Sequence, residues 1–87
     1  MNPPRAYAVI APLSLYDTLR GLSRPRRRLI EDFLHRLARH PALRGDFEAP
    51  GEDNRVHQVK MIGDWLISYW IDHPAREIRV TSLEPIE

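Results

Sequence analysis

Residues 55–84 read RVHQVKMI (55–62), GD (63–64), WLISYWID (65–72), HPA (73–75) and REIRVTSLE (76–84). The three longer runs are rich in β-branched and aromatic residues, and short turn-forming pieces separate them. Gly63 is the first central residue of a two-residue turn, where a type II′ hairpin requires a positive φ. We therefore predict an antiparallel meander of three strands.

Residues 65–72 carry apolar side chains on both faces of the predicted strand. Trp65, Ile67 and Tyr69 point one way, while Leu66 and Trp70 point the other. An apolar pattern on both faces is typical of a central strand that is covered on both sides. The run 76–84 instead alternates apolar and polar residues, which indicates a half-buried strand.

Residues 23–40 show the clearest helical pattern in the chain. Ser23 can cap the start of this helix, and Pro41 ends it. Its apolar residues recur as neighbouring pairs every four positions, which gives one wide apolar face; they are Leu29, Ile30, Phe33, Leu34, Leu37 and Ala38.

The rest of the chain completes the predicted fold. The apolar run 6–11 predicts a first strand, and Ser14 can cap a short helix through Leu22. Residues 41–54 are rich in Pro, Gly and acids and indicate a surface loop, with one brief extended piece at Phe47. The prediction is an α+β domain spanning residues 1–87, in the order β-α-α-β-β-β. An N-terminal helical hairpin packs on one face of a small antiparallel sheet.

Composition restricts the classes of protein to consider. The chain has 87 residues, of which 43% are hydrophobic and 29% charged, as in one globular domain. It has no Cys, so disulfides and thiolate metal ligands are excluded, and no apolar run is long enough to cross a membrane. We expect a cytoplasmic protein without a cofactor. His35 and His40 lack acidic partners at ligand spacing, so we predict no metal site.

The charge is unevenly spread, although the formal net charge is only +1. Residues 24–44 hold seven Arg against Glu31 and Asp32. Guanidinium groups suit phosphate recognition, so we predict a nucleic-acid-binding patch at Arg24, Arg27, Arg28, Arg36 and Arg39. The alternative is a solvated helix face without a partner.

The run GDWLISYWIDHP (63–74), followed by EIRV (77–80), resembles the hairpin strand and last strand of the RelE/ParE superfamily of bacterial type II toxins. Proteins of this kind are often described as plasmid-stabilisation toxins. The resemblance implies a small antitoxin partner and either a homodimer or a hetero-oligomer with that antitoxin. The RelE-like branch implies a metal-free interferase that cuts mRNA on the ribosome; the ParE-like branch implies an inhibitor of DNA gyrase.

Metal-free RNA cleavage needs an acid, a base and cations near the developing charge. The resemblance puts Lys60 at a basic position of the RelE-like site, and Arg55, His57 and Arg79 are the nearby substitutes. Alternation places Lys60 and His57 on opposite faces of their strand.

Other positions of that site differ from the family pattern. Gln58 stands where the family has a basic residue, and Trp65 or Leu66 stands where it has an Arg on the second strand of the meander. The tail 84–87 contains neither of the residue types, Arg and Tyr, that the family has near its C-terminus. A catalytically inactive interaction module on the same fold is therefore an alternative function.

Overall fold

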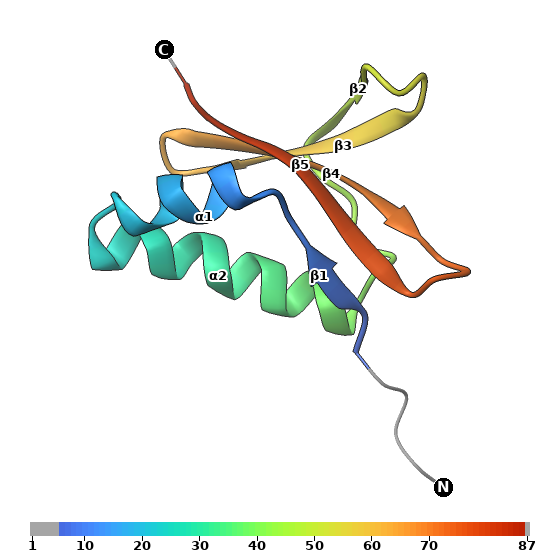
Figure 1. Cartoon of the computed structure of the whole chain (residues 1–87), viewed down its shortest axis with the longest axis horizontal. Helices are drawn as coiled ribbons and strands as arrows, with labels where there is room; N and C mark the ends of the chain where they lie inside the picture. The colour runs from blue at the N-terminus through green and yellow to red at the C-terminus, as the bar shows by residue number, and fades with distance from the viewer. Residues whose placement is uncertain (1–5, 87) are drawn as a thin grey trace, which may run out of the picture.

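A computed structural model describes residues 6–86, so Glu87 of the tail lies outside the described residues. Two helices and five strands follow one another along this part of the chain (Figure 1). They are β1 (Ala8–Ile10), α1 (Leu13–Arg20), α2 (Arg24–Arg39), β2 (Phe47–Pro50), β3 (Val56–Ile62), β4 (Trp65–Asp72) and β5 (Glu77–Pro85). Among residues 6–86, neither helix combines the length and hydropathy needed to span a bilayer.

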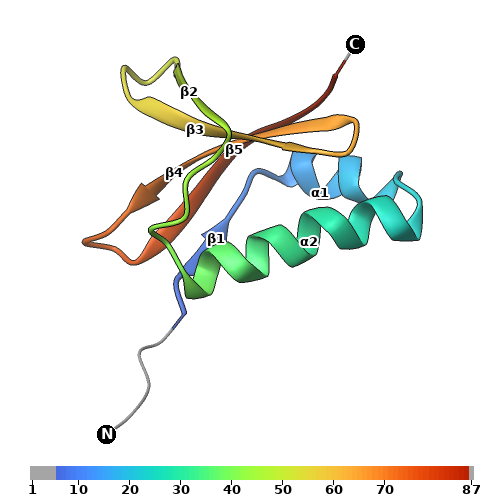
Figure 2. The ribbon, with the colours of Figure 1, turned by 180° about the vertical axis from the view of Figure 1, so that it is seen from behind.

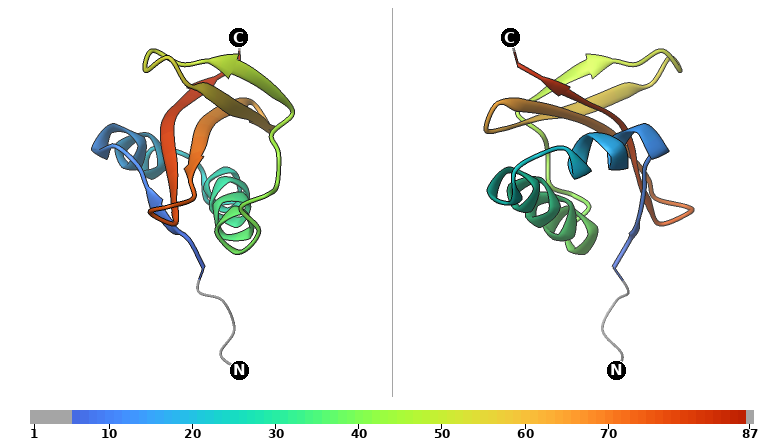
Figure 3. Two further views of the ribbon diagram at one scale, coloured as in Figure 1. Left: turned by 90° about the vertical axis from the view of Figure 1, so that its right-hand side faces the viewer. Right: turned by 60° about the vertical axis from the view of Figure 1, so that its left-hand side comes forward.

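The strands form one sheet in the order β1-β5-β4-β3-β2, and β4 is central as predicted. The predicted α+β class and the helical hairpin on one face of the sheet are confirmed, since both helices lie on the same side (Figure 3). Two details of the prediction were wrong. β1 pairs in parallel with β5, so the sheet is mixed rather than antiparallel. The brief extended piece expected at Phe47 is present as the four-residue edge strand β2, paired antiparallel with β3, so the predicted order β-α-α-β-β-β lacked one strand.

The meander from β3 to β5 has the predicted turn at Gly63. Gly63 has φ 59°, and Ile62 pairs with Trp65 across the two-residue turn. A positive φ at the first central residue is the feature that a type II′ turn requires and that glycine adopts without strain. The local sequence alone therefore fixes the register of this hairpin.

α2 is built as its sequence indicates. The Arg26 amide donates a hydrogen bond to the Ser23 side chain over 3.4 Å, which caps the helix. Five of its six predicted core residues are buried, whereas Leu29 is 55% exposed. The predicted cap of α1 was wrong, because Pro12 occupies the N-cap position and Ser14 lies inside the first turn.

The core lies between the helices and one face of the sheet, which we call the covered face. Ile67 and Tyr69 of β4 and Ile78 of β5 have no exposed surface. The Tyr69 ring packs on Phe33 of α2 with 5.8 Å between ring centroids. Burial, and secondarily the charge of Asp46, raises the pKa of Tyr69 to about 12.

The opposite side of the sheet is called the open face. Side chains alternate along each strand, so Ser68 and Trp70 of β4 point to the open face when Ile67 and Tyr69 point to the covered one. Residues that pair across neighbouring strands point to the same face of a sheet. Lys60 pairs with Ile67 and is therefore on the covered side of β3, whereas Val59 pairs with Ser68 and is on the open side. The segment after α2 runs from the helix layer to β2, the edge strand at the opposite end of the sheet from β1 (Figure 2).

Candidate functional site

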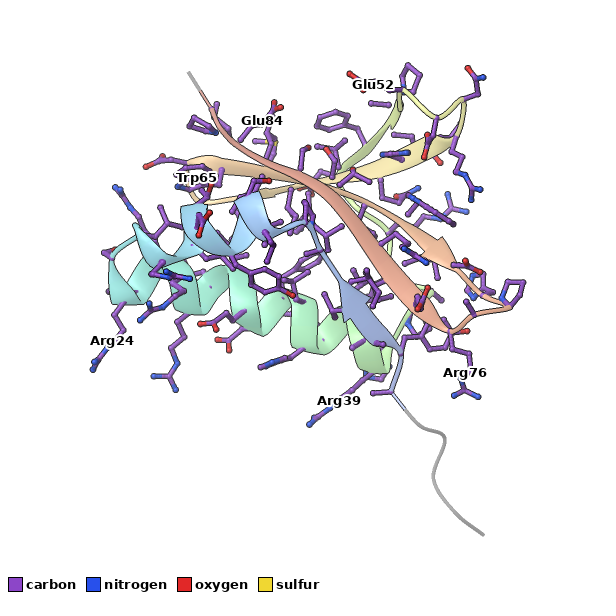
Figure 4. The ribbon with its side chains drawn as sticks, viewed as in Figure 1. Arg24, Arg39, Glu52, Trp65, Arg76 and Glu84 are labelled. Atoms are coloured by element: carbon purple, nitrogen blue, oxygen red, sulfur yellow. The ribbon has the colours of Figure 1, made fainter. Side chains whose placement is uncertain are left out.

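A cavity of about 380 Å³ lies on the open face, beneath the turn that joins β2 to β3. Its lining is mostly polar and includes Glu52, His57, Ser68, Thr81, Ser82 and Glu84. In Figure 4, Glu52 and Glu84 both lie on the side of the sheet away from α2. The open face is therefore hollowed at a place where hydroxyl groups, carboxylates and an imidazole meet.

His57 is held on both ring nitrogens and is only 7% exposed. Its Nε2 lies 2.9 Å from Asp53 Oδ1, and its Nδ1 lies 3.1 Å from Thr81 Oγ1. The Thr81 hydroxyl donates its only proton to the Ser68 carbonyl over 3.2 Å, so Nδ1 is the donor toward Thr81. This arrangement fixes the orientation of the imidazole in the way a catalytic or structural histidine requires.

The backbone around this histidine is shaped to receive it. A Cβ atom at Gly51 would lie 2.3 Å from His57 Nε2, so only glycine allows the turn to close over the ring. Asn54 has φ 62°, which turns the chain so that Asp53 faces His57. Burial raises the pKa of Asp53, but hydrogen bonds from the Arg55 amide and from His57 outweigh that effect and hold it below the usual value.

The two arginines predicted for the site also lie on the open face. The Arg55 guanidinium lies 3.8 Å above the Trp70 ring, and its Nε is 3.8 Å from Asp53. Trp70 is paired with Arg79 in the register of β4 and β5, and Arg79 Nη2 lies 2.7 Å from Glu77. Each guanidinium therefore already has an acidic partner.

Lys60 is separated from this group. It lies on the other side of β3, as alternation predicted, and its Nζ is 3.2 Å from Asp46. The Met61 amide donates a 2.7 Å hydrogen bond to the same carboxylate. That amide, and then Lys60, lower the pKa of Asp46. The structure thus places Arg55, His57 and Arg79 on the open face, with neither arginine lining the cavity beside His57, and Lys60 on the other side of β3.

Three participants in the site were not predicted from the sequence. Asp53 and Thr81 position His57, and Trp70 supports Arg55. Asp53 precedes His57 by four residues, but that spacing has a meaning only on a helix and this segment is a hairpin turn. Within residues 6–86, no three His, Asp or Glu side chains are placed to hold a metal ion.

The predicted nucleic-acid-binding arginines lie on the opposite side of the molecule. Arg24 and Arg39 stand at the two ends of α2 and point away from the sheet (Figure 4). Arg27 is half-buried and lies 3.9 Å from Glu31. Arg28 and Arg36, like Arg24 and Arg39, are exposed.

Comparisons with known proteins support the fold. No family model matches the chain, and no curated protein does. Among solved structures, the chain resembles the archaeal RelE–RelB complex from Pyrococcus horikoshii OT3, with a TM-score of 0.77 and 19% sequence identity. The match covers 92% of this chain and 94% of the other. The protein therefore has the RelE-like fold that its hairpin residues predicted.

Proposed function

We propose that the protein is the toxin of a type II toxin–antitoxin module and is neutralised by a small antitoxin. The observation that carries this proposal is the match, over nearly the full length of both chains, to a structure of a RelE–RelB complex. The hairpin residues GDWLISYWIDHP (63–74) support it as well, because they resemble the hairpin strand of the RelE/ParE superfamily.

The proposal is tested by controlled expression in a bacterial host. We expect growth to stop on induction and to resume when the small protein encoded in the adjacent reading frame is expressed as well. An Ile67→Asp variant is the control, because a carboxylate at a fully buried core position prevents folding. Normal growth in the presence of soluble, folded wild-type protein would contradict the proposal.

The first candidate for the target is ribosome-bound mRNA, cut at the open face. There His57 would exchange a proton with the 2′-hydroxyl or the leaving oxygen through Nε2, provided that the RNA displaces Asp53 from that nitrogen. Arg55 and Arg79 would bind the phosphate, provided that it displaces Asp53 and Glu77 from them. Lys60 takes no part in this arrangement because it lies on the other side of β3.

Cleavage of mRNA in a translating extract, mapped by primer extension, tests this candidate. His57→Gln and Arg79→Ala should abolish cuts that the wild type makes, while both variants still bind the antitoxin. Lys60→Ala is the matched control because it removes a basic group from the same strand on the other side. Equal loss of cleavage in Lys60→Ala would contradict a site at Arg55, His57 and Arg79.

The second candidate is a function without RNA cleavage, either ParE-like inhibition of gyrase or an inactive interaction module. The pairing of Arg55 and Arg79 with acids favours it, as do the carboxylates of Glu52 and Glu84 at the cavity. Such a face repels a phosphate backbone. Growth arrest that persists in His57→Gln, together with inhibited DNA supercoiling in vitro, would identify the gyrase inhibitor. An interaction module would leave both growth and supercoiling unchanged.

A further inference from the structure

The outer face of α2 carries a row of cations that the proposed function does not use. We define this face by Arg24, Arg28, Arg36 and Arg39, all of which are exposed. Within residues 6–86 these four side chains form no ion pair. At the C-terminal end of the helix, Arg36 and Arg39 border a shallow hollow of about 380 Å³ together with His35, His40 and one acid, Asp32.

Pairing distinguishes this face from other basic groups of the protein. Arg20 lies 3.8 Å from Asp17, and Arg26 lies 3.5 Å from Asp64. On the open face, Arg55 and Arg79 are likewise paired with acids. Four guanidinium groups on one helix that have no acidic partner among residues 6–86 repel one another, and a bound polyanion removes that repulsion. The outer face of α2 is therefore suited to an anionic partner.

The residue types indicate phosphate rather than bases as the group recognised. Guanidinium groups bind phosphate oxygens in a bidentate manner. Proteins that hold single strands stack the bases on exposed aromatic rings. The aromatic residue of α2, Phe33, is buried in the core with only 6% exposure. The outer face of α2 therefore has the groups that contact a backbone, and within α2 no exposed Phe, Tyr or Trp that would stack on unpaired bases.

The spacing along the helix fits a double-stranded backbone. Arg28 and Arg36 are separated by a rise of about 12 Å, given 1.5 Å per residue. The major groove of B-form DNA is about 12 Å wide. Arg24 and Arg28 can thus contact phosphates on one side of the groove, and Arg36 and Arg39 phosphates on the other. Asp32 lies between the two pairs and borders the same hollow as Arg36 and Arg39, so the duplex would have to place its open groove, not a phosphate, over this carboxylate.

We propose that the outer face of α2 binds the phosphate backbone of duplex DNA across its major groove, without reading the base sequence. Phosphate contacts fix position and orientation but carry no sequence information directly. This inference goes beyond the proposed toxin function and does not rest on it, because none of its residues lies on the open face.

Fluorescence anisotropy with labelled DNA duplexes of two unrelated sequences tests the proposal. We expect equal affinities for both sequences, and a slope of log K against log salt of about −3.6 for four phosphate contacts. The double variant Arg36→Ala/Arg39→Ala should reduce the magnitude of that slope by about 1.8. Arg24→Ala/Arg28→Ala should do the same from the other end of the helix.

The matched control is Arg20→Ala/Arg26→Ala, which removes the same charge from residues that are already paired. Its slope should stay at the wild-type value, and thermal melting should show that every variant is folded. The proposal is overturned if the wild type binds no duplex DNA at low salt, or if the control pair lowers the slope as much as the test pairs. Tighter binding to polyglutamate or to duplex RNA than to duplex DNA would also overturn it.

Discussion

The covered and open faces of the sheet are stabilised by different interactions. On the covered face, Ile67 and Tyr69 are fully buried against apolar residues of the helices. On the open face, His57 is also buried, but its polar ring is stabilised there by hydrogen bonds to Asp53 and Thr81. Apolar packing accepts many residues of similar volume, whereas a hydrogen-bonded imidazole requires particular atoms at particular distances. The face with fewer buried apolar groups is therefore the one whose geometry is more narrowly specified.

A similar contrast separates the cations of the open face from those of α2. The open-face arginines lie beside carboxylates, and Lys60, on the other side of β3, does too. On the outer face of α2 the arginines have no such partners among the described residues. A phosphate must displace an acid to reach the first group, but it reaches the second without competition. The position of a basic residue in the sequence does not reveal this difference.

The largest expected effect is on the covered face. Ile67→Ala removes a fully buried side chain from the central strand and should lower the free energy of unfolding by about 2–5 kcal/mol. Total stabilities are about 5–15 kcal/mol, so this variant should be close to unfolding. Urea denaturation followed by circular dichroism measures the change.

The matched control for that substitution is Ile86→Ala, at an isoleucine that is 39% exposed. It should change the free energy of unfolding by no more than about 0.5 kcal/mol. Equal losses in the two variants would show that burial on the covered face does not dominate stability.

A smaller effect is expected on the open face. Thr81→Val keeps the shape of the side chain but leaves His57 Nδ1 without its partner, which should cost about 1–3 kcal/mol. Ser82→Ala, in the next position of β5, removes a hydroxyl that makes no side-chain hydrogen bond within the described residues and should be nearly neutral. If both substitutions are neutral, the hydrogen bond to His57 does not hold the open face together.

The smallest effect depends on pH and concerns Asp46, which directly precedes β2 and accepts hydrogen bonds from Lys60 and Met61 of β3. The folded state lowers the pKa of Asp46, so its contribution to stability is complete above the unfolded pKa, about 4, and is lost as pH falls through the folded value. Asp46→Asn removes that contribution, so stability should fall less steeply in acid than in the wild type. Urea midpoints measured at a series of acidic pH values test this, and superimposable profiles would refute it.

Most of the fold could be predicted because its signals are local. The apolar pattern on both faces of residues 65–72, Gly63 at the turn and Ser23 before α2 each specify structure through neighbours in the sequence. The strand β2 was predicted only as a brief extended piece because FEAP contains an acid and a proline; its pairing with β3 comes from tertiary structure. The parallel pairing of the three-residue β1 is likewise a long-range property.

The candidate site was predictable only in part, for the same reason. Strand alternation separated Lys60 from His57, and the structure places them on opposite sides of β3. The partners of His57 come from a turn with positive φ at Asn54 and from Thr81, at an irregularity in the pairing of β4 with β5. Such turns and bulges leave little trace in hydrophobic periodicity. The roles of Lys60, Arg55, His57 and Arg79 in catalysis remain predictions.

The pairing of β1 with β5 also determines the order in which this chain can complete its structure. Ala8 pairs with Glu77, so the first strand has no partner until the last strand has been synthesised. During translation the helices and the β3–β4 hairpin can form from neighbouring residues, but one edge of the sheet stays open until β5 leaves the ribosome. Removal of β5 would therefore take away the partner of β1 and one partner of β4 together.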